Sequence, residues 1–281
     1  MNYRHIYHTG NFADVFKHCV LIMLAGSLFK KNSPLLYLDT HAGIGKYDLT
    51  AESTQKTREY ENGVARIYNL HDCPSTIKTY QDTVRAVNSH TKKLHFYPGS
   101  PLIMRMLLRT QDHMVLTELH KEDVLLLKRY FYRDKQVAVH HTNGYQGLKA
   151  FLPPKCGRGL ILIDPPFEEK NEFEQIVTEL QTALKRFSSG IYMIWYPIKN
   201  LLEVKNFYAN LRTIECKNIL AIELSVNKNI EDSGLTSCGL IIINAPWQFE
   251  IELKPTLSWL CKALALDSTG SWDIKKIDSA L

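Results

Sequence analysis

The stretch Leu160-Ile161-Leu162-Ile163-Asp164-Pro165-Pro166-Phe167 decides how this chain folds and where its chemistry lies. Four consecutive apolar residues lead into a carboxylate, two prolines and an aromatic ring. A short run that is apolar throughout is typical of a strand buried on both faces of a parallel sheet. Each proline fixes φ and pushes the residue before it into an extended conformation, so the following loop is stiff. The pattern predicts a rigidly held Asp164 at the edge of a sheet.

The residues after this strand predict a site for an amino group. The Asp164 side chain and the Pro165 carbonyl both accept hydrogen bonds, which suits a group with two N–H donors. Phe167 offers a flat face for a base, and stacking of this kind is worth roughly 1–3 kcal/mol per base. We therefore predict Asp164, Pro165 and Phe167 as catalytic residues, with Phe167 also binding the substrate. An ordinary proline-containing turn is the alternative interpretation.

Six further short apolar runs accompany the central one. They cover 35–39, 114–118, 137–141, 191–196, 219–224 and 239–244. Helical patterns separate most of them, and alternating strands and helices predict an α/β fold with a mostly parallel, doubly wound sheet of seven strands. The last two runs have no helix-length pattern between them, so we expect them to pair antiparallel.

The stretch 48–95 interrupts this alternation. It is charged, rich in Tyr and patterned for helices, and it predicts an inserted helical subdomain. The domain that contains the sheet would then consist of 1–47 and 96–281. After the insertion, Ser100 as N-cap and Pro101 as the first helical residue predict the start of the next helix.

Polar or glycine-rich residues follow three other strands, where open α/β sheets bind nucleotides. Gly43 lies in the turn after the first strand, where glycine lets a backbone approach a ligand closely. Glu118 ends the second strand, and its carboxylate can accept from both ribose hydroxyls. Asn143, followed by Gly144, can read the edge of an adenine, although Asn-Gly is also a common turn. We predict all four as cofactor-binding residues.

Taken together, the motifs resemble those of the RlmJ family, bacterial class I S-adenosyl-L-methionine-dependent methyltransferases. The resemblance covers nearly the whole chain and is carried by 3–5, 10–18, 37–43, 97–102, 116–120, 159–166 and 195–197. It implies a Rossmann-like methyltransferase fold and methyl transfer to N6 of adenine 2030 in 23S ribosomal RNA. It also implies S-adenosyl-L-homocysteine as product, and an RNA partner that is free or early in ribosome assembly.

The resemblance further implies roles for single residues. Asp164 is implied as the catalytic acceptor, and Tyr3, with Arg4 beside it, as substrate-binding. Cofactor contacts are implied for Lys17, His18, His41, Ser100, Glu118, Asn143 and Asp164. This chain departs from the family pattern at Asn143, where the family has Asp, and at Phe167, where it has Tyr. Asn keeps a hydrogen-bond acceptor, whereas Phe keeps the ring and loses a hydroxyl contact.

Composition sets the remaining limits. The 281 residues are 45% hydrophobic and 22% charged, as in soluble globular proteins. A net charge of +5 permits an RNA partner without requiring one. Six scattered cysteines without a CxxC pair predict reduced thiols in a cytoplasmic protein, and the histidines lack the spacing of a metal site. The apolar runs and the polar N-terminus predict neither a membrane span nor a signal peptide, and no obligate protein partner is evident.

Other functions share the decisive motif. A DNA adenine methyltransferase or an rRNA guanine-N2 methyltransferase would use the same Asp-Pro-Pro-Phe chemistry. A protein glutamine methyltransferase usually carries Asn in place of Asp164. A non-catalytic RNA-binding assembly factor would keep the fold, but the intact motif argues against it.

Overall fold

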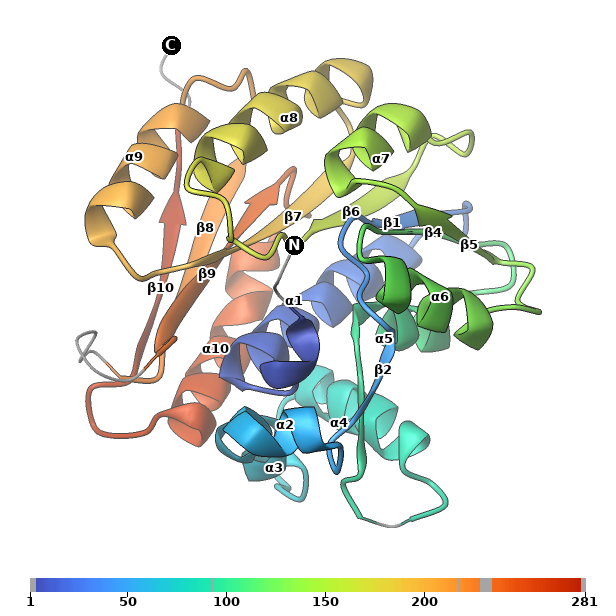
Figure 1. Cartoon of the computed structure of the whole chain (residues 1–281). Coiled ribbons are helices and arrows are strands. Elements are labelled where there is room, and N and C mark those ends of the chain that lie inside the picture. Colours follow the sequence, from blue (N-terminus) through green and yellow to red (C-terminus); the bar gives the residue numbers. More distant parts are fainter. Residues whose placement is uncertain (1–3, 92, 217, 228–233, 279–281) are drawn as a thin grey trace.

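A central eight-stranded sheet organises the molecule, in a computed structural model that describes residues 4–91, 93–216, 218–227 and 234–278. The strand order is β10-β8-β9-β7-β6-β1-β4-β5 (Figure 1). The strands are β1 Leu36–Asp39, β4 His113–Glu118, β5 Val137–His141, β6 Gly159–Ile163, β7 Ile191–Pro197, β8 Ile219–Ser225, β9 Ser237–Ile243 and β10 Ser271–Lys276.

The pairing confirms the predicted mostly parallel α/β sheet. The strands from β5 through β4, β1 and β6 to β7 are parallel, whereas β7–β9, β9–β8 and β8–β10 are antiparallel. All seven predicted strands are present, and the expected antiparallel pair is β8 and β9. The eighth strand, β10, was not predicted, because its half-exposed sequence Ser-Trp-Asp-Ile-Lys-Lys lacks an apolar run. It forms an edge of the sheet.

Helices cover both faces of the sheet (Figure 1). One face carries α7 Gly144–Phe151, α8 Glu172–Arg186 and α9 Leu201–Leu211. The other carries α1 Phe12–Phe29, α5 Ser100–Leu107, α6 Lys121–Tyr130 and α10 Phe249–Leu264. Each layer has its own hydrophobic cluster, because β1 and β6 alternate their apolar side chains between the two faces. The sheet is therefore buried on both sides, as its apolar strands require.

The central helix α1 is long and apolar enough to cross a membrane by length and composition. The sequence-based prediction that the chain has no membrane-spanning segment did not take this helix into account. However, 72% of this helix is buried inside the protein, as expected of a core helix. The side chain of Asn11 caps its start by accepting a hydrogen bond from the backbone N–H of Asp14. This capped first turn carries several side chains of the site described below.

The segment between β1 and α5 contains short elements, of which α4 packs against α1. They are β2 Lys46–Asp48, α2 Glu52–Thr57, η2 Glu59–Asn62, α3 Val64–Ile67, α4 Ser75–Val87 and β3 Phe96–Pro98. A further short turn, η1 His5–Tyr7, precedes α1. β2 and β3 pair antiparallel, and the buried side chains of α3 and α4 belong to the same cluster as those of α1. The division of the chain at 48–95 remains a prediction.

Candidate active site

A cavity of about 280 Å³ lies where β1, β4, β6 and β7 end, beside the first turns of α1. Most parallel strands of the sheet deliver their carboxyl ends here, which is the edge where α/β sheets bind ligands. Nine of the predicted site residues line the cavity: Lys17, His18, His41, Gly43, Ser100, Glu118, Asp164, Pro165 and Phe167. The fold therefore brings together residues that are as much as 150 positions apart in the chain, as their numbers show.

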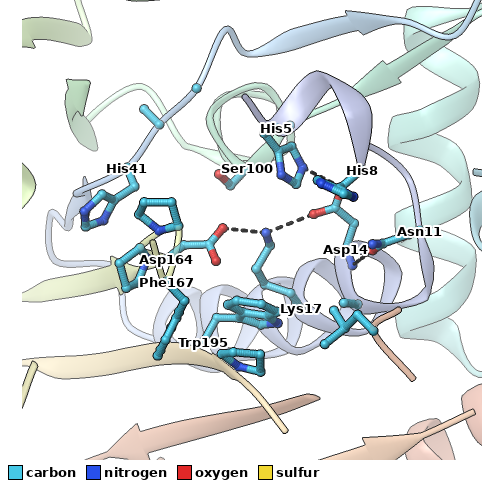
Figure 2. A pocket seen from close by; sticks show the side chains of 18 of the residues that line it. His5, His8, Asn11, Asp14, Lys17, His41, Ser100, Asp164, Phe167 and Trp195 are labelled. Carbon is cyan, nitrogen blue, oxygen red and sulfur yellow. Dashed lines mark hydrogen bonds and ion pairs between the residues drawn. The ribbon is translucent and has the colours of Figure 1, made fainter. Parts of the chain in front are cut away.

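A buried lysine links two carboxylates at the centre of the cavity (Figure 2). The Lys17 ammonium lies 2.5 Å from Oδ2 of Asp164 and 2.9 Å from Oδ1 of Asp14. Oδ2 of Asp14 also lies 2.8 Å from Nε2 of His5 and accepts the backbone N–H of Gly10 at 2.8 Å. The side chains of Lys17 and Asp14 are only 6% and 1% exposed, so each depends on its ionic partners for compensation of its charge.

Neighbouring charges favour the ionised forms of Lys17 and Asp14. Burial opposes the charge of Lys17, but the carboxylates of Asp14 and Asp164 outweigh it and raise the lysine pKa. Burial likewise opposes the charge of Asp14, yet His5 and Lys17 hold its pKa well below the usual range. Asp14 was not predicted from the sequence as a member of the site, although it lines the cavity. The signal was there, since Asp14 and Lys17 are three residues apart and thus neighbours on one helix face.

The loop after β6 presents Asp164 together with aromatic rings. Phe167 has φ of 51°, a left-handed conformation that costs a non-glycine residue on the order of 1–3 kcal/mol. Its ring packs edge-on against Phe173 at 5.0 Å and Trp195 at 5.8 Å between centroids. Phe167 and Trp195 both line the cavity, so the predicted aromatic wall next to the carboxylate is present.

The turn after β1 is fixed by a contact with Glu118. Gly43 has φ of 62°, and its N–H donates to Oε2 of Glu118 at 2.8 Å. A Cβ atom at Gly43 would lie 2.2 Å from the hydroxyl of Tyr47, so no other residue fits without rearrangement. The other oxygen of Glu118 accepts the N–H of His120 at 2.7 Å. A carboxylate offers about four lone pairs, so Glu118 retains acceptor capacity toward the cavity it lines.

A further buried carboxylate, Asp39, lies next to the site. It ends β1 and accepts hydrogen bonds from Tyr37 at 2.8 Å and from the Ser100 hydroxyl at 2.7 Å. Burial raises the pKa of Asp39 to about 6, although these two hydrogen bonds oppose the shift. The predicted N-cap role of Ser100 is wrong: Gly99 occupies that position, and the Ser100 side chain is committed to Asp39 instead.

Burial keeps His18 as a neutral imidazole, and two tyrosines form a hydrogen-bonded chain to its ring. Tyr80 donates its hydroxyl to Tyr97 at 3.1 Å, and the Tyr97 hydroxyl lies 2.8 Å from Nδ1 of His18. Because Tyr97 receives the proton of Tyr80, its own is directed to Nδ1, which leaves the histidine proton on Nε2. Burial lowers the pKa of His18 to about 3. His18 is therefore an uncharged hydrogen-bond donor, in contact with the cavity.

The depressed pKa of His18 predicts a pH dependence of stability. The unfolded chain binds a proton at His18 below about pH 6.5, whereas the folded chain does not until about pH 3. The stabilising contribution is thus complete above pH 6.5 and is lost as the pH falls. When the pH falls from 7 to 4.5, the free energy of unfolding should decrease by about 2–3 kcal/mol less for His18→Gln than for the wild type. Denaturant titrations at the two pH values measure this difference. The control His90→Gln, at an exposed site, should show the pH dependence of the wild type. A wild-type pH dependence in His18→Gln would refute this account.

Two predicted cofactor contacts lie outside the residues that line the cavity. The Asn143 side chain caps α7, accepting from the N–H of Tyr145 at 2.9 Å and of Gln146 at 3.4 Å. Gly144 permits close packing, since a Cβ atom there would lie 2.3 Å from the carbonyl oxygen of Thr40. Both residues thus have structural roles, and their contact with a cofactor stays a prediction.

The cap at Asn143 predicts an asymmetric response to substitution. Asn143→Ala removes the acceptor for two backbone N–H groups and should lower the free energy of unfolding by about 1 kcal/mol. Asn143→Asp retains an acceptor and should leave stability unchanged at neutral pH. Thermal unfolding of both variants measures the difference. Equal loss in the two would show that the cap contributes nothing.

The predicted substrate residues at the N-terminus have separate outcomes. Tyr3 lies outside the described residues. Arg4 does not line the cavity but forms ion pairs with Glu122 at 3.1 Å and Asp123 at 2.6 Å, near its rim. In the described ranges, no group of three His, Cys, Asp or Glu side chains is arranged to hold a metal ion.

Comparisons with known proteins agree with this architecture. A family described as "Ribosomal RNA large subunit methyltransferase D, RlmJ" matches residues 32–277. Ribosomal RNA large subunit methyltransferase J of Haemophilus influenzae is 41% identical over 277 residues, or 99% of each chain. The Escherichia coli K12 protein of the same name is 43% identical over 270 residues, or 96% of each chain. A crystal structure of a Legionella pneumophila protein superposes with a TM-score of 0.87 at 38% identity, covering 96% of this chain and 98% of that one.

Proposed function

Because the chain belongs to the RlmJ family of ribosomal RNA large subunit methyltransferases, we propose that it transfers a methyl group from S-adenosyl-L-methionine to N6 of one adenine in 23S ribosomal RNA, adenine 2030. One observation supports a base with an amino group as the target, and the family resemblance supports adenine. A stiff Asp164-Pro165-Pro166 loop places a carboxylate in the same cavity as the aromatic rings of Phe167 and Trp195. This combination suits a flat base that carries an amino group.

The polar groups around the cavity fit S-adenosyl-L-methionine. When bound, it supplies a methyl group on a positively charged sulfur atom. Glu118 would accept hydrogen bonds from the ribose hydroxyls, since its two backbone bonds leave lone pairs unused. The turn at Gly43 lets the backbone approach the ligand, and neutral His18 would donate to its carboxylate. The lysine charge at the centre is already balanced by Asp14 and Asp164.

The residues on the base side orient the amine. Lys17 binds Oδ2 of Asp164, and we assign Oδ1 to the amino group, with the Pro165 carbonyl as the second acceptor. These two bonds localise the nitrogen lone pair, which in adenine is otherwise delocalised into the ring. Holding the reacting atoms in line lowers much of the activation barrier in reactions of this kind. Asp164 then accepts the proton released by the amine, directly or through one water.

Mass spectrometry of the product tests the proposal. Unmodified 23S rRNA, DNA and a protein lysate are each incubated with the purified chain and tritiated S-adenosyl-L-methionine. We expect label in rRNA alone, recovered as N6-methyladenosine after nuclease digestion. Label in guanosine, in DNA or in protein would reject the adenine-N6 assignment in favour of that substrate. The absence of label in all three would point to a non-catalytic RNA-binding protein.

A further inference from the structure

The outer face of α6 and the turn after it combine positive charge with exposed apolar side chains. α6 packs beside β4 and the edge strand β5 (Figure 1). Five exposed cationic side chains lie on 121–135: Lys121, Lys128, Arg129, Arg133 and Lys135. Large exposed hydrophobic side chains lie among or next to them: Leu119, Leu125, Leu126, Tyr130 and Tyr132. We call these ten residues the α6 surface.

The positive charge of the α6 surface is not balanced locally. The acidic residues of the same segment are already engaged: Glu122 and Asp123 pair with Arg4, and Asp134 pairs with Arg105. Within the part of the chain that the structure describes, none of the five cations takes part in an ion pair. Such a cluster attracts a polyanion.

The exposed rings and aliphatic chains indicate the form of that polyanion. Tyr132, in the turn after α6, is 81% exposed, and Leu125, within α6, is 58% exposed. Exposed apolar groups rimmed by charge mark interaction sites. Cations that contact phosphates, combined with aromatic rings that stack on bases, are the features by which proteins bind single-stranded nucleic acid.

The α6 surface also begins at the rim of the active site. His120 and Asp123, at the start of α6, line the cavity. Because a helix rises 1.5 Å per residue, α6 extends about 15 Å from that rim. A strand bound along this helix would therefore lead directly to the cavity, where its next bases are presented to Asp164.

We propose that the α6 surface binds the unpaired ribosomal RNA strand that flanks the target base, with its cations on phosphates and Tyr132 stacked on a base. This inference rests on the proposed function and extends it to the substrate outside the cavity. A second copy of the chain is a poor occupant, because a twofold contact would place five cations against five others.

A matched pair of double variants tests the proposal. Arg129→Gln/Arg133→Gln removes two cations of the α6 surface, and Lys155→Gln/Lys185→Gln removes two exposed cations that precede β6 and β7 on other elements. Dissociation constants for an unmodified 23S rRNA fragment are measured by filter binding between 50 and 200 mM salt, with kcat, KM and the cofactor dissociation constant alongside. Both variants lose two positive charges, so a difference between them reports position and not net charge.

We expect only the α6 variant to bind the RNA more weakly. Each phosphate contact on a single strand contributes about 0.7 to the slope of log affinity against log salt, so the slope should fall by about 1.4. Relative to wild type, the weakening should then be about sevenfold larger at 50 than at 200 mM salt. Tyr132→Ala should raise the dissociation constant at least about fivefold without changing the slope. In both cases kcat at saturating RNA and cofactor binding should stay at wild-type values.

Unchanged affinity and slope in the α6 variant, relative to the control, would overturn the proposal. The proposal would also fail if the wild type were a dimer while the α6 variant were a monomer with unchanged RNA affinity. The α6 surface would then join two copies of the chain. Product analysis keeps the two proposals apart. If the wild type binds the fragment through this surface but forms no N6-methyladenosine, the proposed function fails and the RNA-binding surface stands.

Discussion

Asp164→Ala is expected to reduce methyl transfer by about 100- to 10,000-fold, because the amine loses both the acceptor that orients it and the group that takes its proton. Cofactor affinity should change only a few-fold. The fold should tolerate the change, since the Lys17 ammonium remains paired with Asp14 at 2.9 Å. Single-turnover rates with saturating rRNA measure the loss, and calorimetry measures cofactor binding.

The control for this experiment is Asp82→Ala. The Asp82 side chain is 55% exposed on α4, where it pairs with Lys78 and Arg85 on the helix surface. Its removal should leave the rate unchanged, because exposed pairs of this kind contribute little. Methyl transfer by Asp164→Ala at a rate near that of the control would show that the carboxylate does not act on the amine.

Lys17→Met is expected to lower the free energy of unfolding by about 3–5 kcal/mol, the usual cost of removing one partner from a buried charge pair. Met preserves much of the side-chain length but leaves Asp14 and Asp164 without their shared cation. The Asp14 carboxylate is 1% exposed and cannot be hydrated in compensation. Methyl transfer should be lost as well, because nothing then positions Oδ2 of Asp164. Denaturant titration and single-turnover rates measure the two effects.

An exposed lysine provides the matched control. Lys30 pairs with Glu252 at 3.3 Å, but its side chain is 68% exposed, so Lys30→Met should cost at most about 1 kcal/mol. The double variant Asp14→Asn/Lys17→Met should recover part of the stability lost in Lys17→Met, since one of the two carboxylates that lost the lysine is then neutral. Equal destabilisation by the two lysine variants would mean that the buried ion pairs do not stabilise the fold.

The sequence by itself determined the strands of the parallel sheet and the edge at which the site lies. Apolar runs such as 160–163 specify buried strands through their own side chains, and two prolines stiffen the following loop locally. Parallel strands deliver their carboxyl ends to one edge, so Gly43, Glu118 and Asp164 were expected to meet there, and all three line the cavity. These features depend on neighbouring residues and on the alternation of strands and helices along the chain, both of which a sequence displays directly.

Only the tertiary structure decided how the charged and polar groups are paired. The Lys17–Asp164 contact joins residues 147 positions apart, and Asp14 becomes part of the site because burial removes water as a competing partner. The Asn143 side chain caps its own helix, and the hydroxyl of Ser100, at the cavity wall, is bonded to Asp39. The half-exposed strand β10 forms because β8 offers it an unpaired edge. Such choices follow from which groups packing brings within hydrogen-bond distance, and the local pattern of the chain does not contain that information.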